Sequence, residues 1–174
     1  MAILSRWGFS RAGLLDNRHG EWWLLAQLVL LAMLLAPPLP PPAWFGFAWP
    51  WPLRAGGALL LLLGLVEALR ALRQLGTNLT PLPEPMPEAA LVTRGPYAQC
   101  RHPLYRALLI GAFAMALLLG SLLHLLISMA LAGLLGGKAR REERSLLRLQ
   151  PAYADYQRQT AAIFPGIPWL DWRS

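Results

Sequence analysis

The chain has 174 residues, of which 56% are hydrophobic and 14% are charged, and its mean hydropathy is +0.40. Because soluble domains average about 45–50% apolar and about 25% charged residues, this composition predicts one integral membrane domain, residues 1–174, instead of a soluble domain. The net charge of +7 does not indicate a nucleic-acid partner, since the basic residues lie in polar segments between apolar runs. The single cysteine excludes an internal disulfide, and the three histidines lack ligand spacing, so no metal site is predicted.

The N-terminal part, residues 1–75, predicts two transmembrane helices. The first covers residues 22–35, where two tryptophans at the start suit a membrane interface. A connector rich in proline and tryptophan follows over residues 36–57, and its prolines are expected to prevent a long helix. The second helix is therefore predicted over residues 58–75.

The remaining part, residues 76–165, predicts a functional loop, a helical hairpin and C-terminal helices. Loops of this length without secondary structure are usually functional or disordered. The polar helix after the hairpin is expected to leave the membrane as a cytoplasmic tail helix. The predicted segments are the loop 76–103, the apolar runs 104–119 and 121–137, and the polar helix 138–162.

The distribution of basic residues predicts the orientation in the membrane. Arg54 is the only one of 16 lysines and arginines assigned to the far side. The positive-inside rule then places both termini and the long loop in the cytoplasm, and we expect a location in a bacterial inner membrane. The resulting fold class is an all-α membrane bundle of about four transmembrane helices.

A polar and aromatic stretch, residues 94–105, leads directly into the third apolar run. Pro103 suits the first position of a helix, because its missing N–H would have no helical partner there. Arg101, His102 and Tyr105 should therefore lie at the mouth of a membrane helix. Charged groups are costly at such a place and often mark function, whereas simple interface anchoring is the alternative.

Two adjacent carboxylates, Glu142 and Glu143, should return to the same membrane face through the hairpin. A helix presents neighbouring side chains about 100° apart, so one of the two is expected to point toward the site, and the sequence leaves open which one. Opposite Arg101 and His102, the pair would suit a ligand with both cationic and anionic groups. A solvated charge run is the alternative. Cys100 is expected to serve packing instead of acting as a nucleophile.

The order and spacing of these elements over residues 75–165 resemble the isoprenylcysteine carboxyl methyltransferase and phospholipid methyltransferase group. The resemblance implies a membrane methyltransferase that uses S-adenosylmethionine and acts on a lipid or small apolar acceptor. The elements that carry it are Gly95-Pro-Tyr97, Arg101-His-Pro-Leu-Tyr105, the hairpin, Glu142-Glu143 and Tyr153-x-x-Tyr156 ahead of Pro165.

The resemblance also implies roles for individual residues. His102 would contact the cofactor carboxylate, and a glutamate would take its ammonium or ribose. Basic residues often follow the Tyr-x-x-Tyr element in this group, but Gln159 and Ala162 stand here, which disfavours an isoprenylcysteine carboxylate and leaves an amine, thiol or hydroxyl acceptor. The implied catalytic residues are Arg101, His102, Tyr105 and Glu143, and the implied cofactor-binding residues are Tyr97, His102, Pro103, Tyr105, Glu142 and Glu143.

Two other functions fit the same pattern. Sterol reductases share a similar C-terminal hairpin architecture, so an NADPH-dependent membrane reductase is one alternative. The other is a non-enzymatic membrane assembly protein whose polar face docks a partner. The sequence leaves the oligomeric state open.

Overall fold

A computed structural model describes residues 16–17, 20–83 and 90–173 of the chain. Within these ranges the protein is helical and contains no β-strand, which confirms the predicted all-α class. Part of the basic N-terminal segment and the prolines at 85 and 87 lie outside the described residues, so their predicted roles stay predictions. The α-helices are α3 (Glu21–Met33), α4 (Trp51–Leu75), α5 (Pro103–Leu119), α6 (Leu122–Leu149) and α7 (Tyr153–Gln159), and the 3₁₀ helices are η1 (Pro42–Phe45), η2 (Gly76–Asn78) and η3 (Gly95–Ala98).

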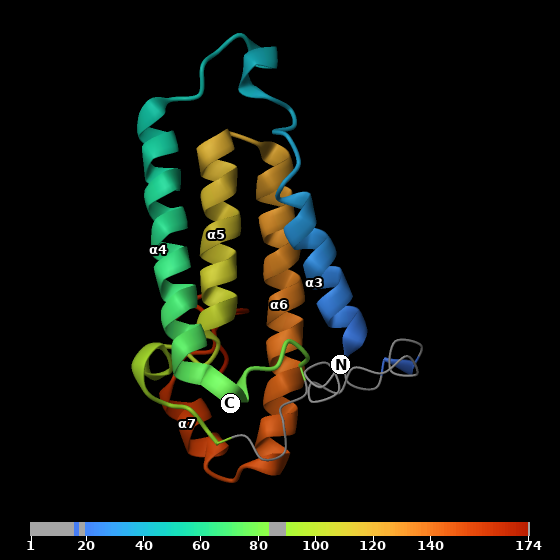
Figure 1. Cartoon of the computed structure of the whole chain (residues 1–174), viewed down its shortest axis with the longest axis vertical. Helices are drawn as coiled ribbons and strands as arrows, with labels where there is room; N and C mark the ends of the chain where they lie inside the picture. Colours follow the sequence, from blue (N-terminus) through green and yellow to red (C-terminus); the bar gives the residue numbers. More distant parts are fainter. Residues whose placement is uncertain (1–15, 18–19, 84–89, 174) are drawn as a thin grey trace.

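The helices α4, α5 and α6 run along the long axis of the molecule, and α3 lies inclined beside α6, as Figure 1 shows. α4 packs along α5, α5 packs along α6, and α3 packs on the outside of α6. The turn between α5 and α6 lies at one end of the bundle, next to the connector between α3 and α4. The end of α4, the start of α5, the end of α6 and all of α7 gather at the opposite end (Figure 1). We call this opposite end the site end.

Two of these helices, α4 and α6, are long and apolar enough to cross a membrane. Along α4, large aliphatic side chains such as Leu62, Leu63 and Leu65 are more than half exposed. A continuous exposed apolar surface of this kind is unfavourable in water, so lipid is its natural environment. α3 and α5 are shorter apolar helices of 13 and 17 residues, and the expected total of four spans stays a prediction.

The start of α4 differs from the sequence prediction. The helix begins at Trp51 instead of at residue 58, with Pro50 as its N-cap residue and Pro52 in its first turn. Proline is tolerated there because the first N–H groups of a helix have no intrahelical acceptor. The prediction that prolines keep the connector non-helical up to residue 57 was therefore wrong for its last turns.

Glycines on α4 permit its close contact with α5. A side-chain carbon added at Gly57 would lie 2.6 Å from the backbone nitrogen of Leu118, and one added at Gly64 would lie 3.2 Å from the carbonyl oxygen of Ala107. Small residues allow helix backbones to approach closely in lipid, where dispersion replaces the hydrophobic effect as the main attraction. Nearer the site end, Glu67 of α4 also accepts a hydrogen bond from Arg106 Nε of α5 at 2.5 Å.

The hairpin between α5 and α6 is tight, as predicted. Gly120 ends α5 with a φ of +61°, a left-handed conformation that favours glycine. Ser121 then caps α6 by accepting a hydrogen bond from the backbone N–H of His124. The His124 ring contacts Ser121 Oγ at 2.8 Å and the carbonyl oxygen of Leu34 at 3.2 Å. His124 is thus a polar residue of the hairpin that joins α6 to the end of α3.

The segment after α7, residues 160–172, folds back onto the bundle, and we call it the C-terminal strap. Its backbone accepts hydrogen bonds from two residues ahead of α5: Arg101 N donates to Ala161 O at 2.8 Å, and His102 N donates to Ala162 O at 3.0 Å. Leu170 packs into the apolar core together with residues of α5 and α6. The strap therefore fixes the chain immediately before α5.

Candidate active site

A buried ion pair between Arg101 and Glu143 forms the centre of the site end. Arg101 Nε donates to Glu143 Oε1 at 2.7 Å, and Nη2 donates to Oε2 at 3.1 Å. The two side chains are 0% and 2% exposed. Removing one partner of such a pair leaves an uncompensated buried charge, so the two residues depend on each other. The hairpin is what brings them together from distant positions in the sequence.

The Arg101 guanidinium is fully engaged by the protein itself. An arginine has five N–H donors, and two of them go to Glu143. Nη1 donates to the carbonyl oxygens of Gln157, at 2.9 Å, and Thr160, and Nη2 donates to that of Trp172 at 2.6 Å. Arg101 therefore holds α7 and the C-terminal strap against α6 and has no N–H left for a ligand.

His102 is oriented by the same glutamate. Its Nε2 lies 2.8 Å from Glu143 Oε1, and because a carboxylate oxygen only accepts, Nε2 is the donor. Its Nδ1 lies 3.8 Å from Glu142 Oε2, which is beyond hydrogen-bond distance. The imidazole also stacks on the Tyr105 ring, with centroids 5.2 Å apart and planes 2° from parallel. Glu143 thus fixes one edge of the ring and Tyr105 fixes one face, which leaves Nδ1 available to a ligand.

The two glutamates point in different directions, which answers a question that the sequence left open. Glu142 is 24% exposed and lines a pocket, and its Oε2 accepts a hydrogen bond from the Tyr105 hydroxyl at 2.9 Å. Glu143 is buried and does not line that pocket. Their separation around the helix therefore places one carboxylate at the pocket and the other in the protein interior.

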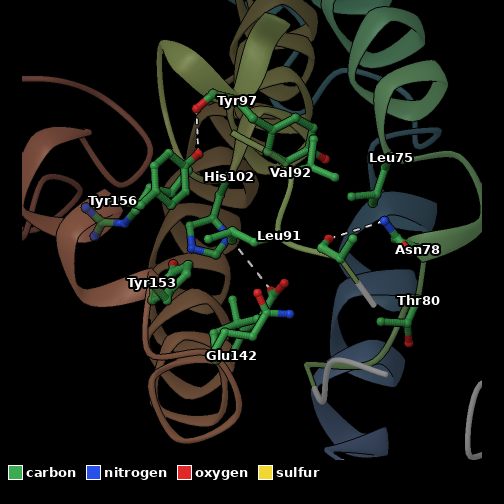
Figure 2. A pocket seen from close by; sticks show the side chains of 14 residues that line it. Leu75, Asn78, Thr80, Leu91, Val92, Tyr97, His102, Glu142, Tyr153 and Tyr156 are labelled. Carbon is green, nitrogen blue, oxygen red and sulfur yellow. Dashed lines mark hydrogen bonds and ion pairs between the residues drawn. The ribbon is translucent and has the colours of Figure 1, made fainter. Parts of the chain in front are cut away.

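The pocket lies between the site end of α6, α7 and the loop after α4. Figure 2 shows His102 and Glu142 next to each other, with Tyr97 and Tyr156 on one side and Asn78 and Thr80 on the other. Apolar side chains from Leu75, Leu91 and Val92 complete the lining. The pocket thus combines apolar and aromatic walls with one carboxylate and one imidazole nitrogen.

Three tyrosines line the same pocket. The Tyr156 hydroxyl donates to the carbonyl oxygen of Tyr97 at 2.5 Å. The Tyr153 hydroxyl is buried and has no hydrogen-bond partner within the described part of the chain. Burial, with a contribution from Glu142, raises the pKa of Tyr97, so its phenol remains protonated at physiological pH.

Cys100 lies close to the site but does not take part in it. The side chain is fully buried, and this burial raises the pKa of the thiol to about 11. A thiol of that pKa is almost entirely protonated near neutral pH, whereas nucleophilic cysteines react as thiolates. The geometry and the pKa agree with the expected packing role.

The structure thus gathers the five residues in two adjoining hydrogen-bonded groups, Arg101–Glu143–His102 and Tyr105–Glu142. The stacked rings of His102 and Tyr105 join the two groups. Of the other predicted residues, Tyr97 lines the pocket, whereas Pro103 is buried at the start of α5 and does not. Neither the Tyr105 nor the Glu143 side chain lines the pocket, so both contact it only through their neighbours.

Two residues of the network escaped the sequence reasoning. Gln157 Nε2 donates to Glu143 Oε2 at 3.1 Å, and Trp172 Nε1 donates to the same oxygen at 2.5 Å. Gln157 follows Tyr153 by one helical turn, so the Tyr-x-x-Tyr element could have led to it. Trp172 belongs to no such pattern.

Known proteins are similar to this chain in sequence and in fold. The model of the phospholipid methyltransferase family matches residues 53–149, which is more than half of the chain. The match includes both residues of the central ion pair, Arg101 and Glu143. The chain therefore belongs to the phospholipid methyltransferase family, and it is an integral membrane protein.

Two curated proteins are similar to part of the chain. The cobalt-zinc-cadmium resistance protein CzcN of Cupriavidus metallidurans is 38% identical over 78 residues, which are 44% of this chain and 36% of that protein. The nickel-cobalt-cadmium resistance protein NccN of Alcaligenes xylosoxydans xylosoxydans is 37% identical over 78 residues, 44% of this chain and 37% of that protein. The matches thus span less than two-fifths of these relatives.

A solved structure also resembles this chain. It is that of the eukaryotic intramembrane Ras methyltransferase ICMT (isoprenylcysteine carboxyl methyltransferase), with a TM-score of 0.65 and 25% sequence identity. The alignment covers 86% of this chain and 54% of that one. The fold and the family expected from the sequence are both confirmed.

Proposed function

We propose that this protein is an S-adenosylmethionine-dependent methyltransferase that acts at the membrane on a lipid or small apolar acceptor. The observation that carries the proposal is the pair of ligand-facing groups at one pocket, the Glu142 carboxylate and His102 Nδ1, which lie 3.8 Å apart. Membership in a methyltransferase family and likeness to ICMT, a methyltransferase of the membrane interior, support the same reaction class.

The pocket residues fit the chemistry of this cofactor. S-adenosylmethionine carries an aromatic base, a ribose diol, a sulfonium cation and an amino acid head group. Leu91 and Val92 offer apolar contacts for the base, and Glu142 offers a negative charge for the ammonium or a hydroxyl. His102 Nδ1 faces the same pocket and is placed to accept a hydrogen bond from a ribose hydroxyl or from the ammonium.

The bound cofactor would supply an electrophilic methyl group on its sulfur. The protein would contribute mainly by holding the reactants in line and excluding water. In this arrangement Glu143 and Arg101 act on the ligand through His102, because neither has a free polar group at the pocket. An amine, thiol or hydroxyl acceptor must also lose a proton, and Glu142 Oε2 and His102 Nδ1 are the basic atoms that face the pocket.

The acceptor follows in part from the positions where this chain departs from the group's pattern. Ala162 is buried, and its carbonyl oxygen accepts from His102, so position 162 offers no cation to the pocket. Gln159 is exposed on α7. We therefore assign an acceptor whose reacting group is an amine, thiol or hydroxyl, on a lipid or small apolar molecule.

We further propose that the site faces the cytoplasm of a bacterial cell. Arg140, Arg141, Arg144 and Arg148 lie on the last turns of α6 at the site end, whereas Arg54 lies in the first turns of α4 at the other end. Basic residues of membrane proteins accumulate on the cytoplasmic side. The site end would therefore be cytoplasmic.

Calorimetry of the purified, detergent-solubilised protein with S-adenosylhomocysteine tests the proposal. We expect saturable binding that is lost in His102→Ala and retained in Gln159→Ala, which changes an exposed residue of α7. A lipid-extract assay with radiolabelled S-adenosylmethionine would then identify the acceptor. Binding of NADPH in place of S-adenosylhomocysteine would overturn the proposal in favour of a reductase.

A further inference from the structure

The C-terminal strap ends in an indole that reaches the centre of the site. Trp172 Nε1 donates to Glu143 Oε2 at 2.5 Å, and the carbonyl oxygen of Trp172 accepts from Arg101 Nη2 at 2.6 Å. We infer that Trp172 is a positioning residue: it fixes the Glu143 carboxylate and, through it, the orientation and tautomer of His102. The inference rests on the proposed function and concerns a residue beyond the family match, which ends at residue 149.

Glu143 holds its neighbours because donors surround both of its oxygens. Oε1 accepts from Arg101 Nε and His102 Nε2, and Oε2 accepts from Arg101 Nη2, Gln157 Nε2 and Trp172 Nε1. A buried carboxylate engaged from this many directions has one permitted orientation. Because His102 donates to Oε1, rotation of the carboxylate would move or release the imidazole. Each donor on Oε2 therefore contributes to the placement of Nδ1 at the pocket.

The chemistry of tryptophan suits this position. An indole N–H can only donate a hydrogen bond, which is what a carboxylate oxygen needs from its partner. Tyrosine or histidine at the same position would also bring an acceptor atom, which a carboxylate oxygen would repel. The guanidinium of Arg140 lies 4.2 Å from the centroid of the Trp172 ring, which is within cation–π range. Arg140 Nη2 also donates to the carbonyl oxygen of Trp169 at 3.0 Å. The indole is thus held by its face and donates from its edge.

Trp172→Phe separates positioning from simple anchoring. Phenylalanine keeps an aromatic ring beneath Arg140 and removes the N–H that reaches Glu143. The matched control is Trp169→Phe, which alters a half-exposed tryptophan of the same strap whose bond to Arg140 comes from the backbone. Benzothienylalanine incorporated at position 172 is a second variant, since it keeps the indole shape and replaces only the N–H by sulfur.

Two measurements read out the effect: long-range ¹H–¹⁵N spectra of ¹⁵N-histidine-labelled protein, and calorimetry with S-adenosylhomocysteine. In the parent protein we expect the His102 ring to carry its proton on Nε2, as the bond to Glu143 requires. Both substitutions at position 172 should shift the His102 ring nitrogens toward mixed tautomers and weaken S-adenosylhomocysteine binding about tenfold, because a hydrogen bond to a charged group is lost. Trp169→Phe should change neither quantity.

Unchanged His102 nitrogen shifts in both position-172 variants would overturn the inference, even if unfolding temperatures fall. This outcome differs from failure of the proposed function. If the parent protein does not bind S-adenosylhomocysteine, the cofactor assignment is wrong, and the His102 spectra still decide whether Trp172 positions the imidazole.

Discussion

The two ends of the helical bundle each contain a buried histidine, and the two rings have different surroundings. At the hairpin end, His124 is fully buried, and its two ring nitrogens contact Ser121 Oγ and the carbonyl oxygen of Leu34. At the site end, His102 is 6% exposed, and among the described residues one ring nitrogen, Nε2, has a hydrogen-bond partner, Glu143. The other nitrogen, Nδ1, lies 3.8 Å from the Glu142 carboxylate, and both residues line the pocket.

The difference shows how to read a buried histidine in a membrane bundle. An imidazole with both nitrogens satisfied by the protein ties helices together: His124 joins the start of α6 to the C-terminal end of α3. An imidazole with one nitrogen fixed and the other directed at a pocket is oriented for a ligand. The partner of the second nitrogen therefore distinguishes the two roles better than burial does.

The largest expected effect comes from removing the carboxylate at the centre of the site end. Glu143→Ala should lower the free energy of unfolding by about 3–5 kcal/mol, because it leaves the buried Arg101 guanidinium without its counter-charge. Denaturant titration in detergent, followed by circular dichroism, measures this change. A loss below about 1 kcal/mol would contradict the central role of the ion pair, since surface ion pairs contribute that little.

The hairpin end should show a smaller loss of stability and no loss of binding. His124→Leu removes the partner of Leu34 O and of the Ser121 hydroxyl, which should cost about 2 kcal/mol. S-adenosylhomocysteine affinity, measured on the same preparation, should stay within about twofold of the parent value. An affinity loss as large as that of His102→Ala would mean that the two ends are not independent.

Glu142→Gln should have the opposite effect to His124→Leu: weaker binding with nearly unchanged stability. Glu142 is partly exposed and contacts the Tyr105 hydroxyl, a bond that glutamine can keep, so unfolding should change by less than about 0.5 kcal/mol. Binding of S-adenosylhomocysteine should weaken about tenfold, as expected when a charged acceptor becomes neutral. Glu142→Gln and Glu143→Ala thus form a matched pair on neighbouring positions. Strong destabilisation by Glu142→Gln would contradict the assignment of Glu142 to the pocket.

Much of the difference between the two ends of the bundle can be predicted from the sequence, because short local patterns specify the hairpin and the start of α5. Gly120-Ser121 between two apolar runs predicts the hairpin, and Pro103 predicts the start of α5, so the joining of Arg101 and His102 with the glutamate pair follows directly. Helical geometry alone does not say which glutamate faces inward. That choice depends on what packs around α6.

Other features depend on contacts between distant segments. The saturation of Arg101 requires carbonyl oxygens from α7 and the C-terminal strap, and no local pattern specifies those backbone positions. Trp172 reads in the sequence like any aromatic residue near a membrane, and only the return of the strap brings its N–H to Glu143. The start of α4 was misjudged for another reason: proline disfavours a helix interior but not its first turn.

The smallest effect is expected at Cys100, which adjoins Arg101 without joining its network. Cys100→Ala should leave methyl transfer within about twofold of the parent rate, because Cys100 is not among the residues that line the pocket and a nucleophile is not required. Iodoacetamide should label folded protein very slowly at pH 8, since burial raises the pKa of the thiol from 9.0 to about 11. Labelling should accelerate toward pH 11.

The raised pKa of Cys100 also gives the direction in which the stability of the protein changes with pH. Because the folded pKa is raised, stability from the neutral thiol is fully present below pH 9.0 and is lost as the pH rises through about 11. The parent protein should therefore lose more stability than Cys100→Ala between these pH values. Rapid labelling of the folded protein at pH 8 would instead place a reactive thiolate beside Arg101, and the site end would then contain a nucleophile as well as an oriented imidazole.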